Sequence, residues 1–313
     1  MLSDLLFSLN TCLPVFFLLG VGFFLRNRGI LDEQYVDRSS RMVFTVLLPG
    51  KLFLDIAQTD IHAAFEGRYT AAVVIGGMVQ FVLAWLLGNL LCRDRDKQSA
   101  FSHACFRGNY AYVGLVLIEN VFGEVIPETA VITAVALMLY NIQGTVLMTV
   151  KESRGGVDVK GILLGIVKNP MIIAIVAALP FAYFEVQLPF VVTKSFGYMQ
   201  ASAGPVALLT VGASIRLSAV RSDLPLLLKI STVKLVLQPL IWVALCLIMG
   251  LTQRQMVTAV IASGMPTAVN TYIITKRMGG DGNLASGAVV VTHLLSMLTM
   301  TTMIFLMKTA GWI

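Results

Sequence analysis

Hydrophobic residues in this chain gather into long runs that are separated by short polar stretches. A run of about 20 apolar residues is the length that an α-helix needs to cross the hydrocarbon of a bilayer. Lipid offers no partner to open backbone groups, and barrel strands would appear as short alternating segments, so helices are expected. The pattern predicts ten membrane spans, at Leu5–Leu25, Met42–Ala57, Tyr69–Leu91, Ala100–Val121, Ala130–Val150, Ile162–Phe184, Phe196–Ile215, Leu224–Gly250, Met256–Ile274 and Leu284–Met307.

Composition supports an integral membrane protein. Of the 313 residues, 57% are hydrophobic and only 13% are charged, whereas a soluble domain carries about 25% charged residues. Cysteines at positions 12, 92, 105 and 246 show no paired spacing, so neither a metal site nor a disulfide framework is predicted. No cofactor is expected.

The basic residues are distributed unevenly between the two sides of the predicted membrane. Fourteen Lys and Arg residues lie in the loops after the first, third, fifth, seventh and ninth spans, and four lie on the other side. Cytoplasmic loops carry the excess of positive charge, so both termini are predicted to lie outside the cell. The net charge of +6 is thereby mostly a topology signal, and nucleic-acid binding has little support.

A short polar segment at 151–160 divides the chain into halves at 1–150 and 161–313, with five predicted spans in each. Because five is an odd number, two such repeats must insert in opposite orientations. Two correspondences support this arrangement. Prolines fall inside the second and seventh spans, at Pro49 and Pro205, and polar interruptions fall in the fourth and ninth, in RGNYAYVG and SGMPTAVNTY. Inverted repeats with interrupted helices are typical of secondary transporters.

An interrupted helix exposes backbone N–H and C=O groups, which lipid tolerates only where they line a cavity or meet another element. Two facing interruptions would form a polar pocket, and helix N-termini in it would favour an anion. The alternative is that the prolines and glycines only kink their helices, which is common in membranes.

Several polar residues inside the spans are candidates for substrate contact. Asn109 and Asn270 lie in the interruptions, and paired amides can hold a carboxylate without a buried charge. The same amides could instead join helices by hydrogen bonds. The full predicted substrate site comprises Asn109, Asn270, Gly108, Tyr110, Gly114, Pro266, Thr267, Asn141, Gln143, Lys51 and Arg107.

The two cations in that set leave alternatives open. A charge deep in a membrane is costly and usually faces a cavity or a partner. Lys51 could attract a carboxylate, or it could pair with Asp55 one helical turn later. Arg107 could contact the substrate, or its long side chain could extend toward water.

The coupling ion is not readable from the pattern, and H⁺ and Na⁺ both remain open. His293 or His103 could relay protons near neutral pH, or each could be a hydrogen-bonded structural histidine. Asp55 is a second candidate for coupling, although it lies near the end of its span. Unwound carbonyls around Gly264 and Asn270 could instead bind sodium.

Five segments in this order resemble the auxin efflux carrier family: RGILDEQYVDRSSRMVFTVLLPGKLF, FRGNYAYVGLVLIENVFG, KNPMIIAI, AGPVALLTVGASI and MPTAVNTYIITKRMGGDGNLASGAVVVTHLLS. The resemblance implies an all-α transporter whose broken fourth and ninth spans cross at the substrate site. Spans 1, 2, 6 and 7 would form a scaffold, often dimeric, and spans 3–5 and 8–10 a moving transport domain. Cargo in this family is typically a small organic anion.

One position departs from the family. Family members usually have a proline in the fourth span where this sequence has Val116. The interruption must therefore depend on Gly108, Asn109 and Gly114, and we expect it to be shallower.

The sequence thus predicts a secondary active transporter that moves a carboxylate or dicarboxylate by alternating access. An intramembrane protease would need a serine–histidine pair in a Gly-x-Ser-Gly context or two deep aspartates, and prenyl transfer would need Asp-rich magnesium motifs. A receptor for a small carboxylate would normally carry a signalling domain or a long cytoplasmic segment.

Overall fold

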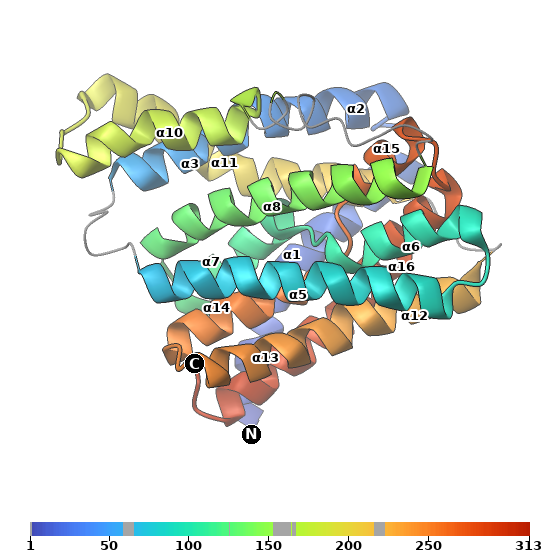
Figure 1. Cartoon of the computed structure of the whole chain (residues 1–313). Coiled ribbons are helices and arrows are strands. Elements are labelled where there is room, and N and C mark those ends of the chain that lie inside the picture. The colour runs from blue at the N-terminus through green and yellow to red at the C-terminus, as the bar shows by residue number, and fades with distance from the viewer. Residues whose placement is uncertain (1, 59–65, 125, 153–163, 165–166, 216–222) are drawn as a thin grey trace.

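The structure is a computed structural model that describes residues 2–58, 66–124, 126–152, 164, 167–215 and 223–313. The chain is all-α across these residues, and each of the ten predicted spans contains helix (Figure 1). Within these described ranges, four helical stretches are long and apolar enough to cross a membrane: α1 (Leu2–Asn27), α5 (Gly67–Leu91), Leu224–Ile248 and α16 (Gly282–Thr309). The stretch Leu224–Ile248 comprises α12 (Leu224–Thr232), a π turn and α13 (Gln238–Ile248). The other helices are α2 (Glu33–Met42), α3 (Leu48–Ala57), α6 (Arg95–Phe106), α7 (Leu115–Phe122), α8 (Pro127–Glu152), α10 (Pro170–Tyr183), α11 (Phe190–Ser214), α14 (Gln253–Ser263) and α15 (Val269–Arg277).

Helix ends differ from the predicted spans where a helix continues into polar sequence. The second span is predicted from Met42, but its helix begins at Glu33, because the Asp32 carboxylate caps the polar helix α2 by accepting from the N–H of Tyr35. A hydropathy pattern detects only the apolar part of such a helix. The predicted hinge at 151–160 lies outside the described residues beyond Lys151 and Glu152, which end α8.

The prolines that the sequence left open as kinks or breaks lie within continuous helices. Pro49 follows a π-helical turn at Val43–Leu47, and Pro205 lies inside α11. A second π turn, Val233–Leu237, precedes Pro239. A proline ring clashes with the carbonyl four residues earlier, and the wider π turn gives that carbonyl room.

The fourth and ninth spans are interrupted, and the two interruptions meet. Helix α6 ends at Phe106 and α14 ends at Ser263, and the chain becomes helical again at Tyr110 and Val269. Gly108 and Thr267 form an antiparallel β-bridge, in which the Asn109 N–H donates to Pro266 O at 2.7 Å and the Ala268 N–H donates to Arg107 O at 3.0 Å. Backbone N–H and C=O groups that lose their helical partners in one interruption are thus hydrogen-bonded by the other. Such pairing is needed because the hydrocarbon of a bilayer offers these groups no partner.

Two sets of helices pack together, and α1 on α16 and α8 on α3 and α10 connect them. Helix α1 packs on α11, and α3 packs on α10 and α11. Helices α5, α6 and α8 pack together, as do α12, α6 and α16. In Figure 1, α2, α3 and α10 lie along one edge of the molecule, and α12 and α13 lie toward the opposite edge.

Helices α1 and α11 approach closely through two glycines, which yields a stability prediction. A Cβ atom on Gly22 would overlap the carbonyl oxygen of Leu209, and one on Gly212 would overlap that of Leu19. Backbone cannot move aside as a flexible side chain can, so we expect Gly22→Ala and Gly212→Ala each to lose about 1–3 kcal/mol. Thermal unfolding of purified protein measures this. Gly20→Ala is the matched control on α1, since nothing lies within 4 Å of its Cβ position. Equal unfolding temperatures for all three variants would show that the contact is not tight.

Candidate functional site

A small pocket, open on one side, lies beside the crossover. The crossover contributes two stretches of its wall, 107–112 and 268–270. The remaining wall comes from α2, α8, α10, α11 and the π turn before α3, through Ser40, Phe44, Leu137, Tyr140, Asn141, Asn169, Met171, Thr210 and Val211. Neither aspartate nor glutamate is among these lining residues.

Two helix N-termini face the pocket. The helical stretch Tyr110–Phe122 and helix α15 both begin at its wall. The first N–H groups of a helix lack acceptors within it, and the aligned peptide dipoles give each N-terminus a partial charge of about +0.5. An anion placed here would meet both ends, which is the usual chemistry of helix N-terminal anion sites.

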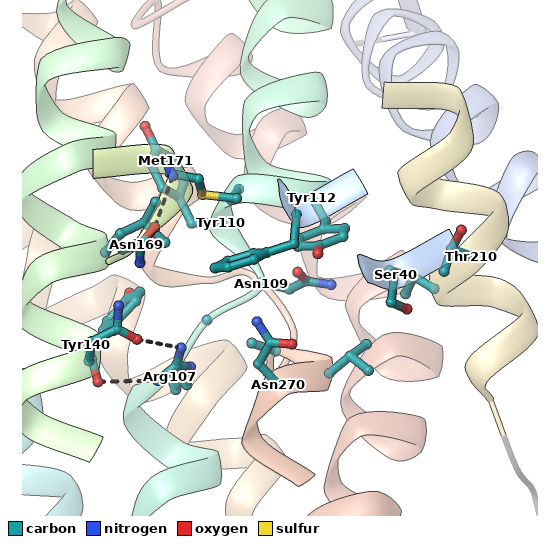
Figure 2. Close-up of a pocket in the computed structure, with 18 residues that line it drawn as sticks. Ser40, Arg107, Asn109, Tyr110, Tyr112, Tyr140, Asn169, Met171, Thr210 and Asn270 are labelled. Atoms are coloured by element: carbon teal, nitrogen blue, oxygen red, sulfur yellow. Dashed lines mark hydrogen bonds between the residues drawn. The ribbon is translucent and has the colours of Figure 1, made fainter. Parts of the chain in front are cut away.

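Arg107 adds a full positive charge. Its side chain is 5% exposed, and it donates from Nη1 to Tyr140 O at 3.2 Å and from Nη2 to Asn141 Oδ1 at 3.1 Å (Figure 2). Among the described residues, no carboxylate lies within ion-pair distance of it. A guanidinium has five N–H donors, so several remain for an anion.

Of the two predicted asparagines, Asn109 ends the first interruption and Asn270 lies in the first turn of α15, and both line the pocket. Figure 2 shows the two carboxamides near the centre of the pocket, turned toward the same space. Asn109 Nδ2 lies 3.2 Å from His293 Nε2, and His293 Nδ1 lies 2.7 Å from Val289 O. Because a carbonyl can only accept, Nδ1 carries the proton, and in the neutral ring Nε2 accepts from Asn109.

Other predicted residues build the crossover itself. Thr267 donates from Oγ1 to Ala104 O, and its N–H donates to Thr292 Oγ1. A Cβ atom on Gly108 would lie 3.1 Å from Lys234 Nζ, and one on Gly114 would lie 2.7 Å from the Tyr110 ring. An added Cβ would force the Tyr110 ring to move at Gly114, whereas at Gly108 it would press only on the flexible end of Lys234.

The break in the fourth span follows from this local sequence without a proline. The chain is non-helical at Arg107–Asn109 and continues as a π turn at Tyr110–Gly114. Val116 packs next to Gly204 of α11: a Cβ on that glycine would lie 3.0 Å from Val116 Cγ2.

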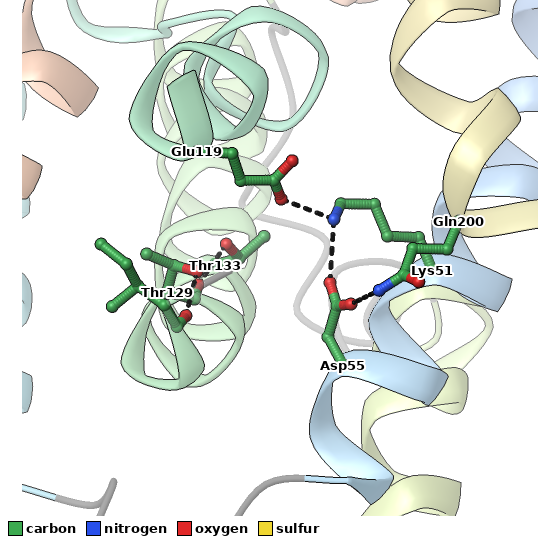
Figure 3. Close-up of polar contacts among 7 residues, drawn as sticks. Lys51, Asp55, Glu119, Thr129, Thr133 and Gln200 are labelled. Atoms are coloured by element: carbon green, nitrogen blue, oxygen red, sulfur yellow. Dashed lines mark hydrogen bonds and ion pairs between the residues drawn. The ribbon is translucent and has the colours of Figure 1, made fainter. Parts of the chain in front are cut away.

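Gln143, Lys51 and Asp55 lie apart from both the pocket wall and the crossover. Gln143 donates to Gly77 O at 3.0 Å, joining α8 to α5. Lys51 lies 3.1 Å from Asp55 Oδ2 and 2.6 Å from Glu119 Oε1, and Gln200 donates to Asp55. Figure 3 shows this network linking α3, α7 and α11. The pairing with Asp55 is one of the alternatives for Lys51, and the contact with Glu119 comes from the tertiary structure.

The sequence interpretation missed a second polar cluster at the crossover. Lys234 is fully buried and donates to Ser263 O at 2.8 Å and to Gln238 Oε1 at 2.9 Å. The sequence does contain a sign of this cluster. Lys234 is a charged residue inside the apolar segment STVKLVLQPL, and charged residues inside apolar segments are the reason that Lys51 and Arg107 were chosen as candidates. Among the described residues, no group of three or more His, Cys, Asp or Glu side chains could hold a metal ion.

Comparison with known proteins gives a consistent result along the whole chain. A family profile described as "Membrane transport protein" (Mem_trans) matches residues 7–161 and 157–304. The chain is 25% identical over 299 residues to the "Putative malonate transporter" of Rhizobium meliloti (strain 1021), covering 90% of this chain and 92% of that protein. It is 23% identical over 298 residues to the "Uncharacterized transporter MJ1031" of Methanocaldococcus jannaschii, covering 93% and 96%. It is 21% identical over 282 residues to the "Uncharacterized transporter YfdV" of Escherichia coli K12, covering 87% and 89%.

Proposed function

Because this chain belongs to the Mem_trans (auxin efflux carrier) family, whose members are membrane transporters and not enzymes, we propose that it is a secondary active transporter of small organic carboxylates. The observation that carries the proposal is the pocket where two helix N-termini, Arg107 and two carboxamides meet with no acidic residue in the wall. Such a site attracts negative charge and repels none.

The substrate class follows from the donors. Arg107 can bind a carboxylate through two parallel hydrogen bonds, and the asparagines and helix N-termini offer further donors around the same space. A dicarboxylate would place one carboxylate on Arg107 and the other on the asparagines and helix N-termini. The name of the Rhizobium meliloti relative makes malonate the first compound to test.

Transport requires the pocket to open to each side in turn. We propose two inverted five-helix repeats, a scaffold from spans 1, 2, 6 and 7, and a transport domain from spans 3–5 and 8–10. The packing of α1 on α11 and of α3 on α10 supports the scaffold. The pocket lies between the crossover and helices α2, α10 and α11, so sliding of one domain along the other would carry the substrate across. The resemblance adds a homodimer held by the scaffold.

Uptake into proteoliposomes tests the proposal. Purified protein should concentrate labelled malonate, or a related carboxylate, against its gradient when an H⁺ or Na⁺ gradient is imposed. A channel would only equilibrate the label, and a receptor would bind it without uptake. If a panel of mono- and dicarboxylates shows neither binding nor uptake, the proposal is wrong.

His293 gives a prediction about coupling. If the ring takes up a proton at Nε2, that nitrogen needs an acceptor, so the Asn109 carboxamide must turn its Oδ1 to the ring and its NH₂ to the pocket. Substrate affinity should then rise as pH falls, by up to about tenfold per pH unit for one coupled proton. A carboxylate bound in the pocket would favour the protonated, positively charged ring.

The test compares the pH dependence of binding in two variants. His293→Gln should bind with little pH dependence and lose pH-driven uptake. His103→Gln is the matched control, because His103 is equally buried but bonds to Thr275. An unchanged pH profile in His293→Gln would leave that histidine a structural role only.

We also propose that both termini lie outside, on the asymmetry of fourteen basic residues against four. Single cysteines on a background without the four native ones test this. An impermeant thiol reagent should label Gln187→Cys, between the sixth and seventh spans, in intact cells and leave Arg93→Cys unlabelled. The opposite pattern would reverse the orientation.

A further inference from the structure

Lys234 lies on the side of the crossover that the pocket does not reach. It belongs to the π turn Val233–Leu237, is fully buried, and its Nζ lies near Gly108 and Ser263. None of the described residues places a carboxylate within ion-pair distance of it. A buried ammonium without a counter-charge is costly, so its surroundings must supply negative potential in another form.

That potential comes from two helix C-termini. Helices α6 and α14 both end here, and the last carbonyls of a helix have no partner within it. Side chains from neighbouring helices satisfy them: Lys234 bonds Ser263 O at 2.8 Å, Gln238 bonds Cys105 O at 2.7 Å, and Gln80 bonds Phe106 O at 2.6 Å.

The glutamines also orient the ammonium. Gln238 Oε1 accepts from both Lys234 Nζ and Gln80 Nε2, each at 2.9 Å, and Trp242 Nε1 donates to Gln80 Oε1. Each helix C-terminus carries a partial negative charge of about half a unit, which favours a positive charge at the position of Lys234 Nζ. We call this arrangement of Lys234, Gln238, Gln80 and the three carbonyls the Lys234 cage.

Carbonyls of unwound segments and half-helix C-termini are the groups with which many transporters coordinate a coupling Na⁺. From the Lys234 cage we infer that the Lys234 ammonium is a tethered cation that occupies the place of a coupling sodium ion. The crossover therefore keeps its charge balance without Na⁺, and the anion binds on the opposite side independently of sodium. This inference deepens the proposed function and rests on it for its role in transport.

The experiment measures thermal unfolding of the purified full-length protein in NaCl and in N-methyl-D-glucamine chloride at equal ionic strength. The wild type should unfold at the same temperature in both salts. Lys234→Ala should unfold several degrees lower in N-methyl-D-glucamine, and added Na⁺ should restore stability in a saturable manner, because an ion that binds only the folded state stabilises it. Lys229→Ala is the matched control, since Lys229 lies on the preceding helix and is bonded at an exposed site to Leu91 O.

Two results would overturn the inference: saturable stabilisation of the wild type by Na⁺, or a Lys234→Ala protein as stable as the wild type in N-methyl-D-glucamine. If Lys234→Ala does not fold in either salt, Lys234→Gln keeps a donor for Ser263 O without the charge and should show the same gain from Na⁺. If neither variant folds, the wild type alone tests the inference, because saturable stabilisation of the wild type by Na⁺ would overturn it. Because no substrate is present, this test reports on the Lys234 cage alone and is valid even if the chain transports no carboxylate. Carboxylate uptake tests the proposed function separately.

Discussion

Replacing Arg107 by glutamine should reduce carboxylate binding by about two orders of magnitude or more. A hydrogen bond to a charged group contributes about 1.5–3 kcal/mol, and a guanidinium can make two such bonds to one carboxylate. Their joint loss corresponds to roughly 10²–10⁴ in affinity. Glutamine can still donate to Tyr140 O, so the side-chain contact that supports the fold is partly retained. Isothermal titration or a ligand-induced shift in unfolding temperature measures the loss.

Two further variants separate charge from geometry at this position. Arg107→Lys keeps the charge without the planar fork, so its affinity should fall between wild type and Arg107→Gln. Arg254→Gln is the matched control, because Arg254 forms an exposed ion pair with Glu124 and is not among the residues that line the pocket. If Arg107→Gln binds carboxylates as the wild type does, this arginine only braces α8 through Tyr140 and Asn141.

Alanine at Asn109 or at Asn270 should weaken binding by about one to two orders of magnitude. Each variant removes one donor to a charged ligand, at about 1.5–3 kcal/mol, while the backbone of the crossover is unchanged. Because the two amides act on one ligand, the double variant should lose less than the sum of the two free-energy changes. Asn120→Ala is the matched control, since this asparagine is on α7 and donates to Thr11 O. Wild-type affinity in both single variants would mean that the amides only join helices.

The local sequence contains enough information to find most of the helices and both interruptions. Apolar runs predict the spans because each apolar residue independently favours transfer into the hydrocarbon of the bilayer. Gly108 and Asn109 in one span, and Gly264 and Pro266 in the other, weaken the helix through their own backbone chemistry. Helix ends were less predictable where the helix continues into polar sequence, as at Glu33.

Partners far apart in the sequence could not be read in the same way. Lys51 had a partner within one turn, Asp55, but its shorter contact is with Glu119, 68 residues away. Lys234 has a local partner in Gln238, four residues later, but the carbonyl that it bonds belongs to Ser263 at the end of another helix. Pro205 and Gly264 look alike as helix breakers, yet α11 continues through Pro205 and α14 ends before Gly264.

The sequence by itself determined an all-α membrane protein, the places where two of its helices open, and the polar residues at those places. Hydropathy and backbone chemistry are properties of each residue and its near neighbours, so they can be evaluated without knowledge of the fold. The tertiary structure alone decided that Gly108 pairs with Thr267, that Asn109 meets His293, and that Lys234 lies against helix ends with no carboxylate beside it. Those contacts depend on how the helices pack, and packing joins residues whose separation along the chain no local pattern encodes.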